Sequence, residues 1–299
     1  MTTELTHGAI VGGIVTTPDL DAALADYQAC LGLRLVEQGL LDADLAASWG
    51  APASAGSRFA TLQPASDASC FIRLVEQVVP DAFRPMRSYG WAAYELTVQD
   101  VYGWPDRLIG SGFEVVGPPR PIEGLPYFVP MQVIGRGREM IYLNQVMDNT
   151  PSSDLPKAQS PVDHIFICVL ACADRLASLD WYRDALKLDE GGSYTINYTM
   201  INKAFDLPDG TQSSMTMVQK GRLPIIEVDG YPAAATVRPG AADLLPAGNA
   251  LVTLAVEDFA ALTLDFIQSP IKRDGVFYQG RRAATVRGLA GELVELIEI

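Results

Sequence analysis

Apolar and polar residues follow one another along the chain in a unit that occurs four times. Each unit opens with a run of β-branched and aliphatic residues, as a strand requires. An aspartate comes next, before apolar residues at helical spacing, and is placed to cap a helix. The four openings are GGIVTTPDLDAALADY from Gly12, AYELTVQDVYGWPDRL from Ala93, HIFICVLACADRLASLDWY from His164 and LVTLAVEDFAALTLDF from Leu251, with the capping residues Asp19, Asp100, Asp174 and Asp258.

After each helix the pattern predicts several short strands, and the last strand of each unit has a similar sequence. These closing strands are SCFIRLVE (69–76), REMIYLNQ (138–145), LPIIEVDG (223–230) and GELVELIE (291–298). The chain is therefore predicted to be an α+β protein of four βαβββ modules.

A polar stretch rich in Pro, Ser and Asp, at 147–163, separates the first two modules from the last two. Such a composition is typical of a linker. We expect two domains, 1–148 and 162–299, joined by a linker at 149–161. In each domain two modules would pair, and their open mixed sheets would curl around a cavity of the kind in which small molecules bind.

Composition narrows the class of partner. The chain has 299 residues, 48% of them hydrophobic and 19% charged, which is typical of a globular protein. Its net charge of −14 argues against binding nucleic acid or an anionic membrane. No glycine-rich phosphate loop suggests a nucleotide cofactor. We expect a small-molecule substrate and a monomer or homodimer.

The sequence also indicates a compartment. It begins without the features of a secretory leader, and no apolar run is long enough to span a membrane. Four cysteines are few for this length and lie in apolar surroundings, as buried thiols in a reducing compartment do. Cys168 and Cys172 have no second Cys or His pair with which to complete a zinc site. We therefore expect a cytoplasmic protein.

Several of these features together resemble the vicinal oxygen chelate superfamily. They are the strand that starts with His164, the PDLDAAL corner between strand and helix, the helix end WYRDALKL (181–188) and the closing strand ELVEL. That superfamily includes glyoxalase I, methylmalonyl-CoA epimerase, fosfomycin and bleomycin resistance proteins, and extradiol dioxygenases. The resemblance covers nearly the whole chain and implies the fold more strongly than the reaction, because this fold hosts several chemistries.

The resemblance also implies where a metal would bind, namely at the start of the first strand and in the last strand of two paired modules. In the C-terminal half these positions fall on His164, Glu227, Leu251 and Glu295. His164, Glu227 and Glu295 are ligand-type residues, and one imidazole with two carboxylates suits Fe, Mn, Co or Zn. Leu251 removes the fourth ligand, so a site that has lost its metal is the alternative.

The residues support this independently of the resemblance. Glu227 and Glu295 each lie in an apolar strand, and burying an unpaired charge there is costly unless a metal offsets it. The alternatives are that alternation turns either glutamate to solvent, and that His164 is a hydrogen-bonded structural histidine.

Other residues complete the predicted cavity. Asn249 lies on the same strand face as Leu251, and these two are expected to contact substrate unless PAGN (246–249) is simply a turn. The polar segment SYTINYTMINK (193–203) is also a candidate lining.

In the N-terminal half the four matching positions hold residues that are not a usual metal set, so that half is expected to be metal-free. They are Gly12, Arg73, Ala93 and Tyr142.

The candidate residues favour isomerase or lyase chemistry on a small carbonyl-bearing or aromatic compound. Glu227 and Glu295 would act as ligand and base, or as an acid and base pair without metal. A ring-cleaving dioxygenase with altered ligands is one alternative, although the superfamily's dioxygenases use two histidines and this chain has Leu251 at the second position. A binding protein of the resistance type, without catalysis, is the other.

Overall fold

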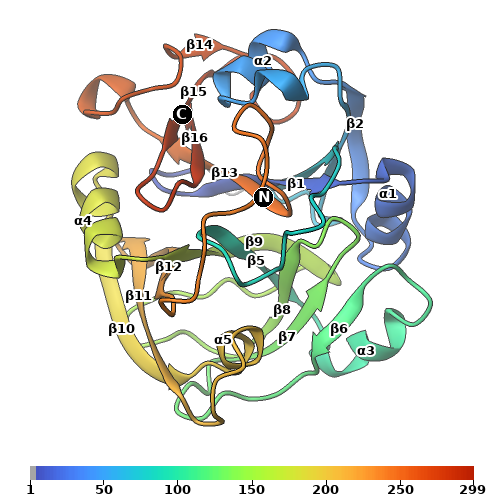
Figure 1. The fold of residues 1–299 in the computed structure, drawn as a ribbon, viewed down its shortest axis with the longest axis vertical. Coiled ribbons are helices and arrows are strands. Elements are labelled where there is room, and N and C mark those ends of the chain that lie inside the picture. Colours follow the sequence, from blue (N-terminus) through green and yellow to red (C-terminus); the bar gives the residue numbers. More distant parts are fainter. Residues whose placement is uncertain (1–4) are drawn as a thin grey trace.

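In a computed structural model, which describes residues 5–299, the chain forms two eight-stranded mixed sheets. Figure 1 shows the sheets one above the other, with β1, β13 and β16 in the upper one and β5, β9 and β12 in the lower one. Four modules of strand, helical segment and three further strands follow one another along the chain. The predicted α+β class and the four βαβββ modules are confirmed.

The first sheet contains the strands of modules one and four. Its order is β14 (Ile271–Lys272), β15 (Arg282–Arg287), β16 (Leu293–Glu298), β13 (Asn249–Val256), β1 (Ile10–Thr17), β4 (Phe71–Glu76), β3 (Arg58–Gln63) and β2 (Arg34–Leu40).

The second sheet contains the strands of modules two and three. Its order is β10 (Asp189–Asn197), β11 (Gln212–Lys220), β12 (Leu223–Gly230), β9 (Val162–Cys172), β5 (Gly90–Val98), β8 (Met140–Val146), β7 (Phe128–Ile134) and β6 (Glu114–Gly117).

The predicted pairing of modules within 1–148 and within 162–299 is therefore wrong. In the first sheet β1 lies antiparallel to β13, and in the second β5 lies antiparallel to β9. All four of these strands are almost entirely buried. Because the four apolar strands are alike, either pairing satisfies the hydrophobic pattern, and the sequence pattern does not distinguish the two.

Helices flank the sheets at α1 (Leu20–Ala29), α2 (Ala43–Ser48), α3 (Trp104–Arg107), α4 (Arg175–Leu186) and α5 (Thr199–Ala204), with single 3-10 turns at Pro52–Ser54, Val101–Gly103 and Phe259–Ala261. Within the described residues no helix is long and apolar enough to cross a membrane.

Only two of the four predicted capped helices have full length. Asp19 caps α1 and Asp174 caps α4, each through a carboxylate that accepts a backbone N–H at 3.0 Å. In module two Asp100 has a left-handed backbone and its side chain caps no backbone N–H, and the helical segment is a single turn. In module four Asp258 caps only a 3-10 turn, and the following segment is not helical because Thr263, Ile267 and Pro270 disfavour a helix.

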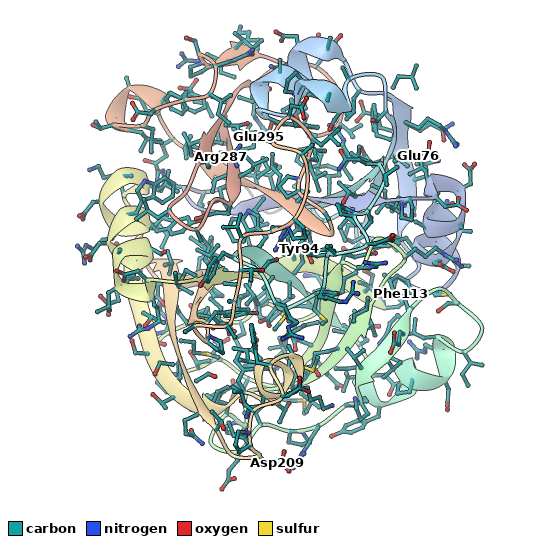
Figure 2. All side chains as sticks on the ribbon, in the orientation of Figure 1. Glu76, Tyr94, Phe113, Asp209, Arg287 and Glu295 are labelled. Carbon is teal, nitrogen blue, oxygen red and sulfur yellow. The ribbon has the colours of Figure 1, made fainter. Side chains whose placement is uncertain are left out.

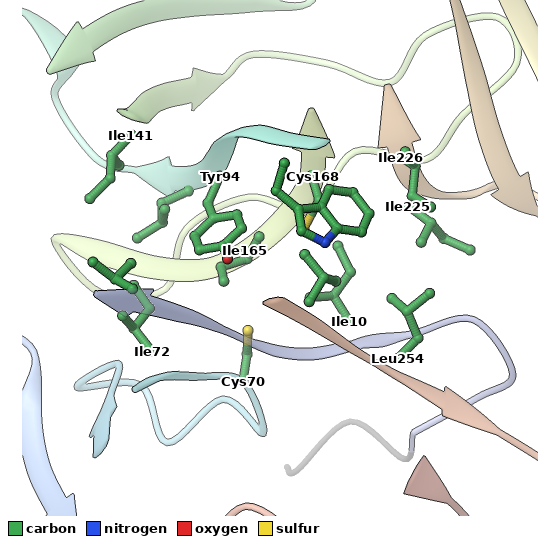
Figure 3. Packing of buried hydrophobic residues seen from close by; sticks show 14 of the residues in the cluster. Ile10, Cys70, Ile72, Tyr94, Ile141, Ile165, Cys168, Ile225, Ile226 and Leu254 are labelled. Atoms are coloured by element: carbon green, nitrogen blue, oxygen red, sulfur yellow. The ribbon is translucent and has the colours of Figure 1, made fainter. Parts of the chain in front are cut away.

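Tyr94 of β5 holds the two sheets together. Its ring is buried between them, as Figures 2 and 3 show, and its hydroxyl lies 2.8 Å from the carbonyl oxygens of both Ile14 and Leu251 in the first sheet. A Cβ at Gly13 would lie 2.6 Å from the Tyr94 ring, so the ring fits only because residue 13 is glycine. The largest apolar cluster draws residues from both sheets.

A tyrosine–glutamate hydrogen bond joins the two modules of each half of the chain. Tyr27 of α1 donates to Glu139, and Tyr182 of α4 donates to Glu292, both at 2.8 Å. Burial raises the pKa of each glutamate to about 7. The two halves of the chain thus contain equivalent contacts. Each sheet, in contrast, joins strands of one half to strands of the other.

Candidate active site

Aromatic side chains fill the concave face of the first sheet around Glu295. This carboxylate is 1% exposed and accepts three hydrogen bonds, from Trp49 Nε1 at 2.8 Å, Tyr278 Oη at 3.0 Å and Thr253 Oγ1 at 2.8 Å. Figure 2 places Glu295 in the upper part of the molecule. Burial raises its pKa, and the three donors lower it. The cost of burying Glu295 is thus offset by hydrogen bonds.

Arg73 is equally enclosed in the first sheet. Its Nε donates to Thr61 Oγ1 at 2.9 Å, and its Nη2 pairs with Glu37 at 2.8 Å. The guanidinium lies over the rings of Phe59 and Phe277. Arg73 therefore has a structural role.

The concave face of the second sheet instead opens into a cavity of about 640 Å³. Its floor contains buried polar side chains of the central strands: Glu95 of β5, Tyr142 and Asn144 of β8, and Glu227 of β12. Apolar side chains form the walls, among them Leu125, Phe128, Ile167, Met215 and Met217. A cavity of this size and lining suits a small organic molecule.

The predicted polar segment 193–203 covers this cavity. Residues of β10 and α5 line it from Tyr194 to Met200, together with Lys203. In Figure 1 α5 lies in front of the second sheet, and its residues Met200 and Ile201 belong to the same apolar cluster as Val169 of β9 and Met215 of β11. The segment therefore lines a cavity, but one that modules two and three share and not one within the C-terminal half.

Tyr198 connects the cover to the floor. Its hydroxyl lies 3.1 Å from Glu227 Oε1 and 3.1 Å from the Tyr142 hydroxyl. Because a hydroxyl has one proton, donation to Glu227 leaves the Tyr198 oxygen free to accept the proton of Tyr142. Burial raises the pKa of both tyrosines, so both hold their protons at neutral pH.

Glu227 is placed to ionise near neutral pH. Burial raises its pKa to about 7, although the hydrogen bond from Tyr198 and the neighbouring Asp229 act in the opposite direction. Glu95 lies on the neighbouring part of the floor, and its Oε2 accepts a hydrogen bond from Asn144 Nδ2 at 2.5 Å. Burial, and then the charge of Glu227, raise the pKa of Glu95 well above its ordinary value.

Asp229 is a third carboxyl of this group. It occupies the same face of β12 as Glu227 because side chains alternate along a strand. It is 1% exposed, and among the described residues neither of its carboxyl oxygens has a hydrogen-bond partner. Burial, and then the charges of Glu227 and Glu95, raise the pKa of Asp229 well above its ordinary value.

Sequence reasoning missed both Glu95 and Asp229. Glu95 stands alone in AAYELTV, and nothing in that run separates a cavity glutamate from an exposed one. Asp229 carried a signal, since EVD in PIIEVDG puts two carboxylates on one face of an apolar strand.

His164 does not lie with Glu227. The residue of β9 that pairs with Glu227 is Val169, and His164 lies nearer the start of that long strand. The His164 side chain is 30% exposed, and its Nδ1 lies 3.2 Å from Asp163 Oδ1. Its predicted position was wrong because β9 begins well before the part of the strand that reaches the cavity.

Asn249 and Leu251 are buried residues of β13 in the first sheet. Asn249 Oδ1 accepts from the backbone N–H of Met140 at 2.9 Å, and its Nδ2 donates to the Met140 carbonyl at 3.1 Å. Leu251 is fully buried in an apolar cluster of the first sheet. Neither residue lines the cavity of the second sheet.

The predicted metal set is therefore not assembled. Glu295 belongs to the first sheet, Glu227 lies in the cavity of the second, and His164 lies outside that cavity. Within residues 5–299 no three His, Cys, Asp or Glu side chains are placed to hold a metal ion. The cavity floor offers only the carboxyls of Glu95 and Glu227, each of which accepts a hydrogen bond from a side chain, and no histidine or cysteine lines the cavity. The residues present therefore do not fit the metal that the resemblance implies.

Comparison with solved structures supports the architecture. Glyoxalase I from Zea mays superimposes with a TM-score of 0.61 at 15% identity, over 97% of this chain and 92% of that one. A mutant of the same maize enzyme gives 0.62 at 16% identity, over 97% and 92%. A candidate dioxygenase from Bacillus subtilis gives 0.62 at 11% identity, over 99% and 86%. This chain has the vicinal oxygen chelate fold.

At these identities the vicinal oxygen chelate fold is what the comparisons establish, and it extends over nearly the whole chain. No protein-family model and no curated protein matches the sequence.

Proposed function

We propose that the protein is an isomerase or lyase that uses carboxylate acid–base chemistry, without a metal, on a small carbonyl-bearing compound bound in the cavity of the second sheet. The observation that carries this proposal is the arrangement of Glu227, with a pKa of about 7, beside the hydroxyl of Tyr198 and near Glu95, whose pKa is raised well above normal by burial and by the charge of Glu227. Two interacting carboxyls that titrate apart provide one base and one acid.

Glu227 is the base of this proposal. Its carboxylate lines the cavity, so it can reach a carbon beside the carbonyl group of a bound compound. A general base works best when its pKa lies near the operating pH, and burial raises the pKa of Glu227 to about 7. Its partner Asp229 lies behind it and does not line the cavity, so it acts on the base and not on the substrate.

Glu95 provides the donor for the substrate oxygen. It lines the floor, and burial and the charge of Glu227 raise its pKa well above its ordinary value, which favours the protonated form. When Glu227 takes a proton from carbon, the electron pair of the C–H bond forms a C=C bond, and the carbonyl oxygen becomes an enolate oxygen. A preorganised O–H donor stabilises that negative charge.

The second half of the reaction returns the proton. In an isomerase, protonated Glu227 gives its proton to a different carbon, or to the other face of the same carbon, and the carbonyl group forms again. In a lyase the electron pair of the enolate expels a leaving group from the neighbouring carbon, and that group takes the proton. Either path restores the Glu227 carboxylate.

Ring cleavage by dioxygen receives no support from this cavity. The residues that line it include no histidine, and the two carboxyls at its floor are held by hydrogen bonds. Binding without turnover is the remaining alternative, and the same experiment distinguishes it.

The test is deuterium exchange at carbon. Acetophenone, 4-acetylbenzamide and 4-acetylbenzoate have exchangeable methyl protons beside a carbonyl group, and proton NMR in D₂O follows their loss. We expect the protein to accelerate exchange of at least one probe, and Glu227→Gln to lower that rate by about 10²-fold or more. Glu190→Gln, an exposed glutamate of β10, is the matched control and should leave the rate unchanged.

Two results would contradict the proposal. If probes bind but none exchanges faster than in buffer, the protein is a binding protein. If Glu227→Gln exchanges as fast as the unaltered protein, the base is another group.

A further inference from the structure

The cavity of the second sheet has acidic residues at its floor and cationic residues at its mouth. Its buried floor contains Glu95 and Glu227, with Asp229 behind them. The exposed residues that line it, and so mark its mouth, include two cations, Arg120 and Lys203.

Both cations lack a carboxylate partner. In the part of the chain that the structure describes, neither Arg120 nor Lys203 forms an ion pair, although many other arginines do. Their charges are therefore not neutralised by a neighbouring carboxylate among these residues. Glu123 also lines the mouth and offsets part of their charge.

The fold holds the two cations on the same side of the mouth. Lys203 Nζ donates to the carbonyl oxygen of Val116 at 3.1 Å, which ties α5 to β6. Arg120 follows shortly after β6, and its backbone N–H donates to the carbonyl oxygen of Pro130 at the neighbouring strand β7. A ligand that enters between α5 and this segment therefore passes both cations.

We propose that the substrates of this site are amphipathic monoanions: compounds with a carboxylate at one end, an apolar middle and a carbonyl group at the other end. The carboxylate would remain at the mouth beside Arg120 and Lys203. The apolar middle would lie against Phe128, Ile167 and Met217, and the carbonyl group would reach the floor.

The opposite orientation is unfavourable. A carboxylate at the floor would lie beside Glu227 and would be buried away from both cations, which is costly. The cavity therefore favours anionic ligands, and it also determines which end of the ligand reaches Glu227. This inference names the substrate class of the proposed acid–base site and rests on that proposed function.

A matched pair of ligands tests it. 4-Acetylbenzoate and 4-acetylbenzamide have nearly the same shape and the same methyl ketone, and they differ in charge. Isothermal titration calorimetry should give about five- to tenfold tighter binding of the carboxylate at low salt, and the difference should shrink as salt is added. Arg120→Gln and Lys203→Gln should each lower the preference, and the double variant should abolish it.

Lys272→Gln is the control, because Lys272 is an exposed cation of β14 in the other sheet. It should leave the preference unchanged. Equal affinity for the two ligands, no detectable binding of either, or a preference that survives in the double variant would each overturn the inference.

These failures are distinguishable from failure of the proposed function. Binding is measured in the Glu227→Gln variant as well as in the unaltered protein, so the preference for the carboxylate is read without catalysis. If the preference for the carboxylate persists while no probe exchanges deuterium, the proposed acid–base reaction is wrong and the cavity is a binding site for organic anions.

Discussion

The indole N–H of Trp49 donates to Glu295 Oε1 over 2.8 Å, although the two residues belong to different modules and lie 246 positions apart. Glu227 occupies the corresponding closing strand of the second sheet and lines an open cavity. The two glutamates are alike in sequence setting, and their surroundings give them different roles. Glu295 is enclosed by donors and stabilises the fold, whereas Glu227 is accessible to a ligand.

Removal of the indole N–H should cost stability without affecting the cavity of the second sheet. Trp49→Phe leaves Glu295 with two donors in place of three and should lower the free energy of unfolding by about 1–3 kcal/mol. Urea denaturation measures the loss. Deuterium exchange of the probes should keep its rate in the folded variant, and a loss of exchange would place Glu295 in the chemistry.

The rate of deuterium exchange should rise with pH through about 7. Glu227 is active as the carboxylate, and its pKa is about 7, so the rate should be low at pH 5 and reach a plateau above pH 8. A pH–rate profile between these limits checks this. A rate that falls as the pH rises would mean that the essential form of the group is protonated.

Asp229 should tune that profile. Asp229→Leu removes the polar side chain that lowers the pKa of Glu227, so this pKa and the midpoint of the profile should move to higher pH. Asp229→Asn keeps a polar side chain there and is the matched control, with a smaller displacement. If the two variants give the same midpoint, the polar group of residue 229 does not set the pKa of Glu227.

Tyr198 should hold the cover of the cavity in place. Tyr198→Phe removes the hydroxyl that reaches Glu227 and Tyr142, so the amides of α5 should lose protection against hydrogen exchange. Mass spectrometry follows this, with α4 as the internal reference. Unchanged protection in α5 would show that the apolar contacts of Met200 and Ile201 are sufficient by themselves.

Stability should fall as the pH rises from about 4.5 to about 7. Glu139 and Glu292 have folded pKa values of about 7 against an ordinary 4.5, so the folded state keeps protons that the unfolded chain has already released. Each contributes stability that is complete below pH 4.5 and is lost by pH 7, at most about 3 kcal/mol per group. Denaturation at pH 5 and pH 8 measures the loss, and Glu139→Gln should reduce it. A stability that is constant over this range would contradict the prediction.

The sequence pattern predicted the modules well and the site only in part. Apolar strands, the capping residues Asp19 and Asp174, and the closing strands are local signals, and all of them appear in the structure. Glu227 and the segment 193–203 were found because a carboxylate in an apolar strand and a polar cluster beside it are unusual.

The rest depended on contacts that are distant in sequence. Glu295 has its donors at Trp49, Thr253 and Tyr278, and nothing local shows that they surround it. Which modules share a sheet is also a choice between partners of equal apolar character. Because β1 pairs with β13 and not with β5, Glu227 and Glu295 belong to different sheets.

The crossed pairing of modules has a consequence for the integrity of the molecule. Each half of the chain contributes half of the strands of each sheet. The two halves are therefore intertwined in the way that the subunits of an intertwined dimer are. A protease that cuts the connection at 149–161 should therefore release no fragment, because every fragment would have to leave two sheets at once. Either half produced alone would expose two apolar edge strands and should associate with a second copy of itself.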